Sequence, residues 1–387
     1  TRVDYNVPMA EQAGAMVIND DTRIRATLPT LKAMIDKGAR IILTAHLGRP
    51  KGERVPSMSL RPVADKLAEL IGQSVAFCDQ CVGDSVAEAV NQLEDGGLLL
   101  LENVRYHAEE EANDAAFAEQ LAANADVYVN DAFGTAHRAD ASMVAVPEAM
   151  GSRPKLLGCL MAKEVEYLGL RLADAKETGG FVAILGGAKV SDKIPAIRNL
   201  AGKVDTMLVG GAMAYTLLAA RGGKIGASRC EEDILEACRD MLAEAESAGT
   251  KVLLPTDHVV AAEFSKDAEA SIVSGDIPDG LMGLDIGPET CQAFADVLAA
   301  AKTIVWNGPM GVFEWEAFRT GTAAVGEAVA RASEGAATGI VGGGDTAAAA
   351  ELLGVAERVS HVSTGGGASL AMLEGSPMPG LDAVAEK

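Results

Sequence analysis

One segment near the end of the chain combines residue types that could bind an anion together with a metal ion. In residues 340–350, a short apolar run leads into three glycines, then Asp345, Thr346 and a run of alanines. Glycines let a backbone approach a phosphate closely, and a helix N-terminus favours negative charge. A carboxylate in the same turn suits the Mg²⁺ that accompanies a nucleotide. The segment therefore indicates nucleotide binding, and the alternative is a tight strand–helix turn capped by Asp345.

The same order of apolar strand, glycine and helix recurs through the second half of the chain. The further examples are Val182–Leu185 before Gly186 and Gly187, Met207–Val209 before Gly210 and Gly211, Thr303–Trp306 before Asn307, Gly308 and Pro309, and His361–Ser363 before Gly365, Gly366 and Gly367. Open parallel sheets bind ligands at the carboxyl ends of their strands. Together these turns predict one crevice lined by glycine.

The first half carries basic and polar residues at its predicted strand ends. These are His46 and Arg49 in one segment, Arg105 in a second and Arg138 in a third. Guanidinium groups match phosphate and carboxylate bidentately, so such a pocket suits a small molecule with both groups. For any single arginine, a surface ion pair is the alternative.

Two further segments of the first half place polar residues where they need a partner or a ligand. Alternation along a strand puts Arg2, Asp4 and Asn6 on one face. Arg23 and Arg25 lie in a predicted first helical turn, where cations oppose the helix dipole. One of these arginines is therefore expected to serve another purpose.

Two lysines adjoin one of the glycine turns. Lys189 and Lys193 bracket a predicted helix start, which Pro195 supports. They could neutralise a phosphoryl group in transfer, and the alternative is solvated lysines at a helix end. No GxxxxGK[ST] occurs, which excludes a P-loop NTPase, and no GxGxxG opens a first βα turn, which disfavours a Rossmann dinucleotide site.

Composition narrows the class of protein. The chain has 387 residues and a formal net charge of −22, which disfavours nucleic acid and anionic membranes as partners. No apolar run is long enough to span a membrane, and no signal peptide opens the chain, so we expect a cytoplasmic protein. The pair Cys78 and Cys81 lacks a second pair at zinc-ligand spacing, so we expect reduced thiols. Since Thr1 stands in a predicted strand, an N-terminal piece is expected to be missing.

Alternating strands and helices predict an α/β protein with parallel sheets. In the first half we expect strands at Arg40–Ala45, Leu98–Leu101 and Asp126–Asn130, and helices at Leu28–Lys37, Leu60–Ile71 and Asp114–Ala123. A long helical pattern followed by Gly179 and Gly180 predicts a linker helix over residues 154–178. The domains are then 1–153 and 179–369, with the tail 370–387 packing back on the first.

The segments RVDYNVP, DDTRIR, HLGRPKG, LENVRYH, NDAFGTAHR, GGAKVSDK, WNGPMGVFE, GGGDT and STGGGAS together resemble the phosphoglycerate kinase family, in family order and over nearly the whole chain. The resemblance implies two Rossmann-like three-layer α/β/α domains joined by a linker helix and hinge. It implies reversible phosphoryl transfer between 1,3-bisphosphoglycerate and MgADP, giving 3-phosphoglycerate and ATP in glycolysis, by a monomer.

By resemblance, specific positions acquire roles. The glycerate pocket is implied to comprise Asp4, Asn6, Arg23, His46, Leu47, Gly48, Arg49, Arg105 and Arg138. The nucleotide side is implied to comprise Gly187, Lys193, Gly210, Gly211, Asn307, Pro309, Glu314, Gly343, Gly344, Asp345 and Thr346. Asp345 is implied to bind Mg²⁺, and the catalytic set is implied to be Arg23, Lys189, Gly343 and Gly366, with Gly365 and Gly367 beside the last.

One departure from the family pattern concerns Asp140, which stands close to Arg138 where the family often has histidine or another polar residue. We expect this acid to point outward.

Three other classes of function are weighed. A nicotinamide-dependent dehydrogenase would need a GxGxxG with a downstream acid, a non-catalytic binding protein would need no paired lysines, and an acidic interaction module would have no use for the glycine turns.

Overall fold

The computed structural model describes residues 1–385, apart from the side chain of residue 176, and it divides into two compact units. The first unit comprises Thr1–Val165 together with the residues from Pro377 onward, and the second comprises Glu166–Ser376. The division falls inside the expected linker segment. Residues 370–376, which we grouped with the tail, are part of the second unit.

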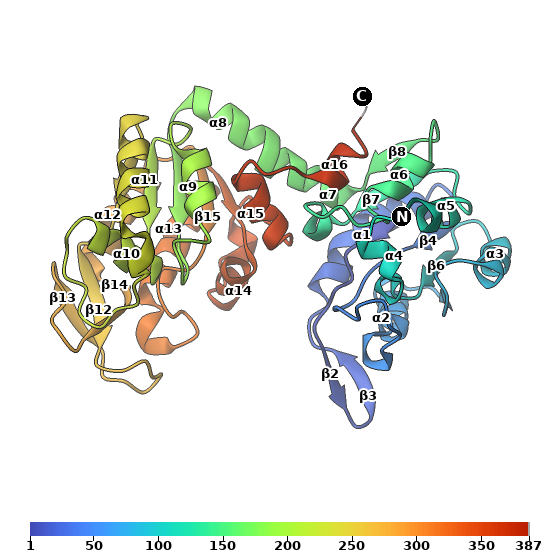
Figure 1. The fold of residues 1–387 in the computed structure, drawn as a ribbon, viewed down its shortest axis with the longest axis horizontal. Coiled ribbons are helices and arrows are strands. Elements are labelled where there is room, and N and C mark those ends of the chain that lie inside the picture. Colours follow the sequence, from blue (N-terminus) through green and yellow to red (C-terminus); the bar gives the residue numbers. More distant parts are fainter. Residues whose placement is uncertain (386–387) are drawn as a thin grey trace. The chain divides into compact units, whose positions relative to one another are not determined.

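The first unit is built on two three-stranded parallel sheets (Figure 1). One has the order β1 (Arg2–Val3), β7 (Tyr128–Asp131), β8 (Lys155–Leu157), and the other β4 (Ile41–Leu43), β6 (Leu98–Leu101), β5 (Val75–Cys78). A parallel bridge between Arg2 and Thr44 joins them, and Val3 N donates to Thr44 O at 3.0 Å. The leucines of β6 are buried, as a central parallel strand requires.

Helices and one hairpin complete the first unit. The helices are α1 (Thr22–Ile35), α2 (Arg61–Ile71), α3 (Asp84–Asn91), α4 (Ala108–Glu111), α5 (Ala115–Ala122), α6 (Ala145–Ala149), α7 (Cys159–Glu164), α16 (Pro379–Asp382) and the 3-10 turns η1 (Pro56–Met58), η2 (Val104–Tyr106) and η3 (Phe133–Thr135). The hairpin pairs β2 (Met9–Gln12) with β3 (Ala15–Ile18). After Pro377 the chain contacts the first unit, where Asn130 Nδ2 donates to Gly380 O at 2.8 Å.

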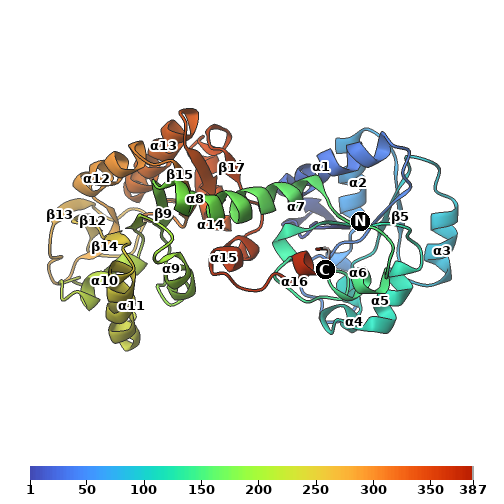
Figure 2. The ribbon, with the colours of Figure 1, turned by 90° about the horizontal axis from the view of Figure 1, so that it is seen from above.

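The second unit is a six-stranded parallel sheet covered on both faces. Its order is β11 (Lys251–Leu253), β10 (Thr206–Val209), β9 (Phe181–Leu185), β15 (Thr303–Asn307), β16 (Thr338–Val341), β17 (His361–Val362). Helices α9 (Ile194–Leu200), α10 (Met213–Ala220) and α11 (Leu235–Ser247) share one apolar cluster, and α12 (Pro288–Ala299), α13 (Thr320–Glu334) and α14 (Gly344–Leu352) share another (Figure 2). The prediction of parallel sheets in an α/β fold is confirmed.

The remaining elements of the second unit are a small sheet and short helices. The antiparallel sheet has the order β13 (Ser271–Ser274), β12 (Asp257–Ala261), β14 (Met282–Ile286). The helices are a π-helical segment (Val165–Arg171), α8 (Leu172–Thr178), α15 (Gly367–Leu373) and the 3-10 turns η5 (Glu232–Ile234), η6 (Glu316–Phe318) and η7 (Ala356–Arg358). This antiparallel sheet was not predicted from the sequence.

The linker helix begins later in the chain than the sequence predicted. Residues 155–157 form strand β8 because they pair in parallel with β7, and Tyr128 N donates to Pro154 O at 2.9 Å. Helix α7 begins only after Gly158.

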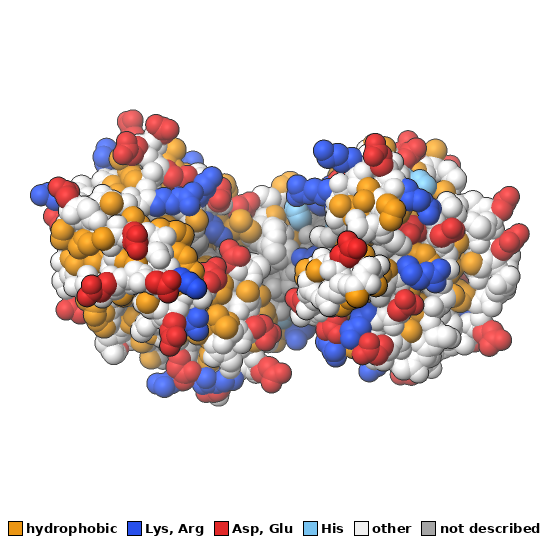
Figure 3. All heavy atoms as spheres, turned by 90° about the horizontal axis from the view of Figure 1, so that it is seen from below, with side chains coloured by type: hydrophobic (Ala, Val, Ile, Leu, Met, Phe, Trp, Pro, Cys, Tyr) orange, Lys and Arg blue, Asp and Glu red, His pale blue; other side chains and the backbone are white. Residues whose placement is uncertain are grey.

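The surface mixes acidic and basic side chains over both units on the face drawn in Figure 3. Within residues 1–385, no helix has both the length and the apolar character that crossing a bilayer demands.

Candidate active site

The first unit collects its predicted site residues around the ends of β1 and β4. Arg23, from the start of α1, donates through NH1 to both carboxylate oxygens of Asp4 at 3.0 Å. Asn6 N donates to Asp4 Oδ1 at 3.2 Å, and Asn6 Oδ1 accepts from Gly48 N at 2.9 Å. The two polar residues that follow β1 therefore hold one segment from α1 and another from the turn after β4.

The turn that carries His46, Gly48 and Arg49 is clamped by Asn103, which sequence reasoning missed. Asn103 Oδ1 accepts from Leu47 N at 3.2 Å, while its Nδ2 donates to Leu47 O at 2.7 Å. Gly48 has a φ of +64°, a backbone region that favours glycine. Arg49, in the same turn, is exposed and makes no ion pair with the described residues.

Two further predicted arginines are linked through a buried acid. Asp140 is 3% exposed and accepts from Arg138 Nε at 3.0 Å and from Arg105 NH2 at 3.4 Å. Glu111 also pairs with Arg138 at 3.1 Å. Our expectation that Asp140 points outward is wrong. Its carboxylate is buried beside two guanidinium groups, whose N–H donors take the place of the water that it would otherwise bind.

The first unit's site is strongly electropositive at its centre. Desolvation holds the pKa of His46 well below 6.5, and the nearby arginines, Arg2 and Arg105 foremost, lower it further. Burial likewise lowers the pKa of Arg105, which also lies near Arg138. An anion entering here would relieve repulsion among these cations.

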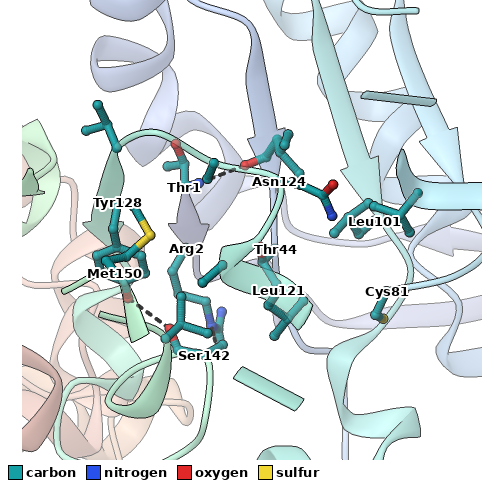
Figure 4. A pocket seen from close by; sticks show the side chains of 16 residues that line it. Thr1, Arg2, Thr44, Cys81, Leu101, Leu121, Asn124, Tyr128, Ser142 and Met150 are labelled. Carbon is teal, nitrogen blue, oxygen red and sulfur yellow. Dashed lines mark hydrogen bonds between the residues drawn. The ribbon is translucent and has the colours of Figure 1, made fainter. Parts of the chain in front are cut away.

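A separate cavity of about 40 Å³ lies in the first unit, with Arg2, Ser142 and Cys81 in its wall (Figure 4). Its walls are mainly apolar, and its volume would hold no more than a few water molecules. It is too small for a phosphorylated glycerate.

In the second unit, the backbones of the predicted glycine turns pack closely against one another. A Cβ at Gly308 would lie 2.2 Å from Gly186 O, and one at Gly211 would lie 2.5 Å from Gly187 N. Gly186 N donates to Asn307 O at 3.0 Å, and Gly211 N donates to Met310 O at 2.9 Å. Only glycine permits this approach, so the ends of β9, β10 and β15 converge.

Side chains tie the remaining turns to this cluster. Gly308 N donates to Thr346 Oγ1 at 2.7 Å, which joins the turn after β15 to the turn after β16. Lys193 Nζ donates to Asn307 Oδ1, and burial lowers the pKa of Lys193. Asn307 Nδ2 is buried and has no partner among the described residues. An unsatisfied donor beside a lysine is a place for a phosphate oxygen.

Two adjoining cavities open at these strand ends. The larger, about 500 Å³, is lined mainly by apolar and glycine residues, including Gly211, Pro309 and Val312, and Glu314 is also part of its lining. The smaller, about 360 Å³, is lined by residues predicted for nucleotide binding or catalysis: Lys189, Lys193, Asn307, Gly343, Gly344, Asp345, Thr346 and Gly366. A nucleotide has an apolar base at one end and anionic phosphates at the other. The larger, apolar cavity suits the base, and the smaller cavity, lined by lysine and glycine, suits the phosphates.

The glycine-rich turn after β16, which carries Asp345, leads directly into helix α14. Helix α14 begins at Gly344, and Gly343 has a φ of +93° at the cap position. Asp345 makes no capping hydrogen bond, and it is exposed and without an ion pair among the described residues. The N-cap interpretation of Asp345 is therefore wrong. Its free carboxylate is an oxygen ligand of the type that Mg²⁺ prefers, since this ion takes few protein ligands and completes its shell with phosphate and water.

Two predicted glycine-turn residues differ in their relation to these cavities, since Gly366 lines the smaller one and Gly210 lines neither. Gly210 does not line either cavity and packs against Met310, whose Sδ would be 2.5 Å from an added Cβ. Gly366 has a φ of +50° and precedes α15. Within residues 1–385, no cluster of three or more His, Cys, Asp or Glu side chains has the arrangement of a metal site.

Sequence reasoning also missed two carboxylates that support the second unit's turns. Glu231 accepts from Val190 N at 2.7 Å and from Ser191 N at 3.1 Å, so it holds the segment between Lys189 and Lys193. Asp285, at the end of β14, accepts from Gly321 N at 2.6 Å and would contact a Cβ at Gly311. Neither residue follows a glycine turn in sequence, and their contacts are long-range.

Comparison with known proteins gives one consistent family. A family model described as phosphoglycerate kinase matches residues 1–376. A phosphoglycerate kinase from Moorella thermoacetica is 53% identical over 387 residues, covering 100% of this chain and 95% of that protein. One from Rippkaea orientalis is 52% identical over 386 residues, with 100% and 94% coverage.

Solved structures agree with the sequence relatives. The structure of phosphoglycerate kinase from Coxiella burnetii has a TM-score of 0.87 and 39% identity, covering 99% of this chain and 94% of that one. The crystal structure of the enzyme from Pyrococcus horikoshii has a TM-score of 0.83 and 31% identity, with the same coverage.

Proposed function

Because the chain belongs to the phosphoglycerate kinase family, we propose that the basic residues of its first unit bind the phosphorylated glycerate and the glycine turns of its second unit bind the nucleotide. The reaction is the reversible phosphoryl transfer of glycolysis between 1,3-bisphosphoglycerate and ADP, giving 3-phosphoglycerate and ATP. The observation that carries the assignment of sides is the contrast in lining: arginines and His46 in one unit, glycines and two lysines in the other.

On the glycerate side, we assign Asp4, Asn6, His46, Leu47, Gly48, Arg49, Arg105 and Arg138 to substrate binding. Arg49 is exposed and without an ion pair among the described residues, so its guanidinium is available to a phosphate or carboxylate. Arg105 and Arg138 are partly neutralised by Asp140, which orients both forks.

On the nucleotide side, the apolar cavity suits an adenine base and the basic cavity suits the phosphates. We assign Gly187, Gly211, Pro309 and Glu314 to the base and ribose side, and Lys193, Asn307, Gly343, Gly344, Asp345 and Thr346 to phosphate and metal. Gly210, expected near the base, lines neither cavity, so we assign it a supporting role through its packing against Met310. Asp345 would hold Mg²⁺, which when bound neutralises charge on the nucleotide phosphates.

The transfer itself needs positioning and neutralised charge more than covalent help from the protein. In the ATP-forming direction, a terminal oxygen of ADP bonds to the acyl phosphorus while the bond to the carboxylate of 3-phosphoglycerate breaks. We propose that Arg23 faces the carboxyl end of the substrate. Lys189 and the backbone N–H groups of Gly343 and Gly366 would stabilise the equatorial oxygens in flight.

The two substrates must meet for this reaction, so we propose that the two units close over them by a hinge in the linker. Small-angle scattering on the full chain tests this proposal. Compaction with both substrates present would support closure, and an unchanged radius of gyration would refute it.

We further propose that the protein acts as a monomer in the cytoplasm. A relative from Triticum aestivum, 50% identical, is named as cytosolic. Sedimentation velocity at micromolar concentration tests the monomer, and a dimeric mass would contradict it.

Isothermal titration with paired variants tests the division of labour between the units. Arg49→Ala should weaken 3-phosphoglycerate binding and leave MgADP binding intact, whereas Asp345→Asn should do the reverse. If either variant weakened the binding of the other substrate instead, the assignment of the two sides would be wrong.

A further inference from the structure

Arg2 and His46 lie on the same side of two neighbouring strands. The parallel bridge pairs Arg2 with Thr44, and His46 follows Thr44 by two residues. Because side chains alternate along extended chain, the His46 ring returns to the face that Arg2 occupies. Both side chains are almost completely buried, at 1% and 3% exposed.

Arg2 uses its guanidinium group in three directions. Its Nε donates to Ser142 Oγ at 2.7 Å, NH1 donates to Val3 O, and NH2 lies 3.2 Å from His46 Nδ1. A guanidinium remains protonated in proteins and carries only donors. The nitrogen that faces it, His46 Nδ1, must therefore accept and carry no proton.

We propose that Arg2 is a positioning residue that fixes His46 as a neutral imidazole with its proton on Nε2, ready to donate to an anionic oxygen of the glycerate substrate. This proposal rests on the assignment of His46 to substrate binding made above. Among residues 1–385, the ring of His46 is hydrogen-bonded to protein only through Nδ1, so Nε2 has no protein partner. A donor without a protein partner, in a layer rich in arginine, suits a carboxylate or phosphate oxygen.

The surrounding charges favour the same state of the ring. Desolvation is the main cause that lowers the pKa of His46 far below 6.5. The charged groups named as lowering the pKa of the ring are four guanidinium groups: Arg2 on β1, Arg105 on η2, Arg23 on α1, and Arg138 after η3. The acids of this layer face these arginines: Asp4 pairs with Arg23, and Asp140 with Arg105 and Arg138. A second proton would add a cation to this set, so the ring stays neutral.

A buried chain of hydrogen bonds keeps Arg2 in this orientation. Ser142 Oγ accepts from Arg2 and donates to Glu110 Oε1 at 2.5 Å, and Glu110 Oε2 accepts from Ser142 N at 2.9 Å. Glu110 is 0% exposed, so the guanidinium charge has a carboxylate nearby within the same buried layer. Glu110, Ser142 and Arg2 thus form a rigid support behind His46.

Nitrogen NMR of the histidine rings tests the state of His46 directly. The full chain has five histidines, so ¹⁵N-histidine labelling gives few signals, and His46→Gln identifies the one that matters. We expect His46 to show the Nε2–H tautomer and no titration from about pH 5.5 to pH 8. A proton on Nδ1, or an imidazolium in that range, would overturn the proposal.

Variants of Arg2 test whether it is the cause. Arg2→Met removes the donor to Nδ1, so the His46 signals should become those of a tautomer mixture and the ring should begin to titrate. Arg2→Lys restores a cation and should recover part of the Nε2–H state. The KM for 3-phosphoglycerate should rise about tenfold in Arg2→Met, while the KM for MgATP stays unchanged.

A control variant at a half-buried arginine separates positioning from the loss of a hydrogen-bonded guanidinium group. Arg153 lies in the same unit and donates to four backbone carbonyls, those of Ala122, Ala125, Ala149 and Met150. Arg153→Met should lower stability and leave the His46 signals unaltered.

The readouts also distinguish this proposal from the function it rests on. Unaltered His46 signals in folded Arg2→Met would overturn the role of Arg2. Altered ring signals with an unchanged KM for 3-phosphoglycerate would instead contradict the placement of His46 in the substrate site, and with it the donor role proposed here.

Discussion

The buried carboxyl of Asp285 gives a prediction whose size follows from its surroundings. Asp285 is 1% exposed and accepts from Ile286 N at 2.9 Å and Gly321 N at 2.6 Å. Burial raises the pKa of Asp285 to about 7, although these two hydrogen bonds lower it. In the folded chain the group therefore keeps its proton well above its ordinary value of 3.8.

The direction in which pH changes the stability follows from the proton that Asp285 takes up on folding. Between about pH 4 and pH 7 the folded state holds a proton on Asp285 that the unfolded state has lost, so stability falls as pH rises, by about 1.4 kcal/mol per pH unit. The contribution is fully present below the unfolded pKa and is lost as pH rises through the folded value. Over the whole window it amounts to about 4 kcal/mol.

Asp285→Asn removes this titration. The amide oxygen can accept from only one of Ile286 N and Gly321 N, and its NH₂ group faces the other, which costs about 1–3 kcal/mol at every pH. We therefore expect the wild-type chain to lose about 2–3 kcal/mol relative to the variant between pH 5 and pH 7.

Urea unfolding at a series of pH values measures the difference. Both tryptophans, Trp306 and Trp315, belong to the second unit, so their fluorescence reports on the unit that contains Asp285. Wild-type and variant stabilities that stay parallel from pH 5 to pH 7 would refute the reasoning, because the carboxyl would then not hold its proton in the folded state.

Three further substitutions, and one control substitution, have definite expected outcomes. Arg23→Ala should lower kcat about a hundredfold or more in a coupled assay, with a modest change in KM, and a preserved kcat would remove Arg23 from the catalytic set. Asp345→Asn should raise the KM for MgADP about tenfold in steady-state kinetics, since the free carboxylate is lost; an unchanged KM would exclude it as a magnesium ligand. Gly308→Ala places a Cβ 2.2 Å from Gly186 O at a φ of +110°, so nucleotide binding should be lost in calorimetry. Gly222→Ala, at a φ of +87° with nothing within 4 Å, is its control and should cost about 1 kcal/mol of stability without affecting the nucleotide.

Local sequence signals predicted much of the second unit. Strand ends that run into paired glycines were recognisable because Gly186, Gly211 and Gly308 must allow backbone approach closer than any Cβ permits. The alternating pattern predicted parallel sheets, and Leu98–Leu101 forms the buried strand expected of it. These features depend on residues that are close together in the chain.

The supporting residues could not be predicted because their partners are distant in sequence. Asn103 clamps a turn that lies 56 residues before it, and Asp140 is buried only because Arg105 and Arg138 converge on it. A lone acid near an arginine looks the same in sequence whether it faces solvent or a partner. Residues 155–157 were predicted as helix because their strand partner, β7, is also distant in sequence. In the structure they pair with the edge of β7 and form a strand.

A coupled assay with the purified full chain, 3-phosphoglycerate and MgATP tests the central claim most directly. The account predicts turnover that requires both substrates and magnesium. Tight binding of both substrates, measured by calorimetry, without formation of ADP and the acyl phosphate would contradict it.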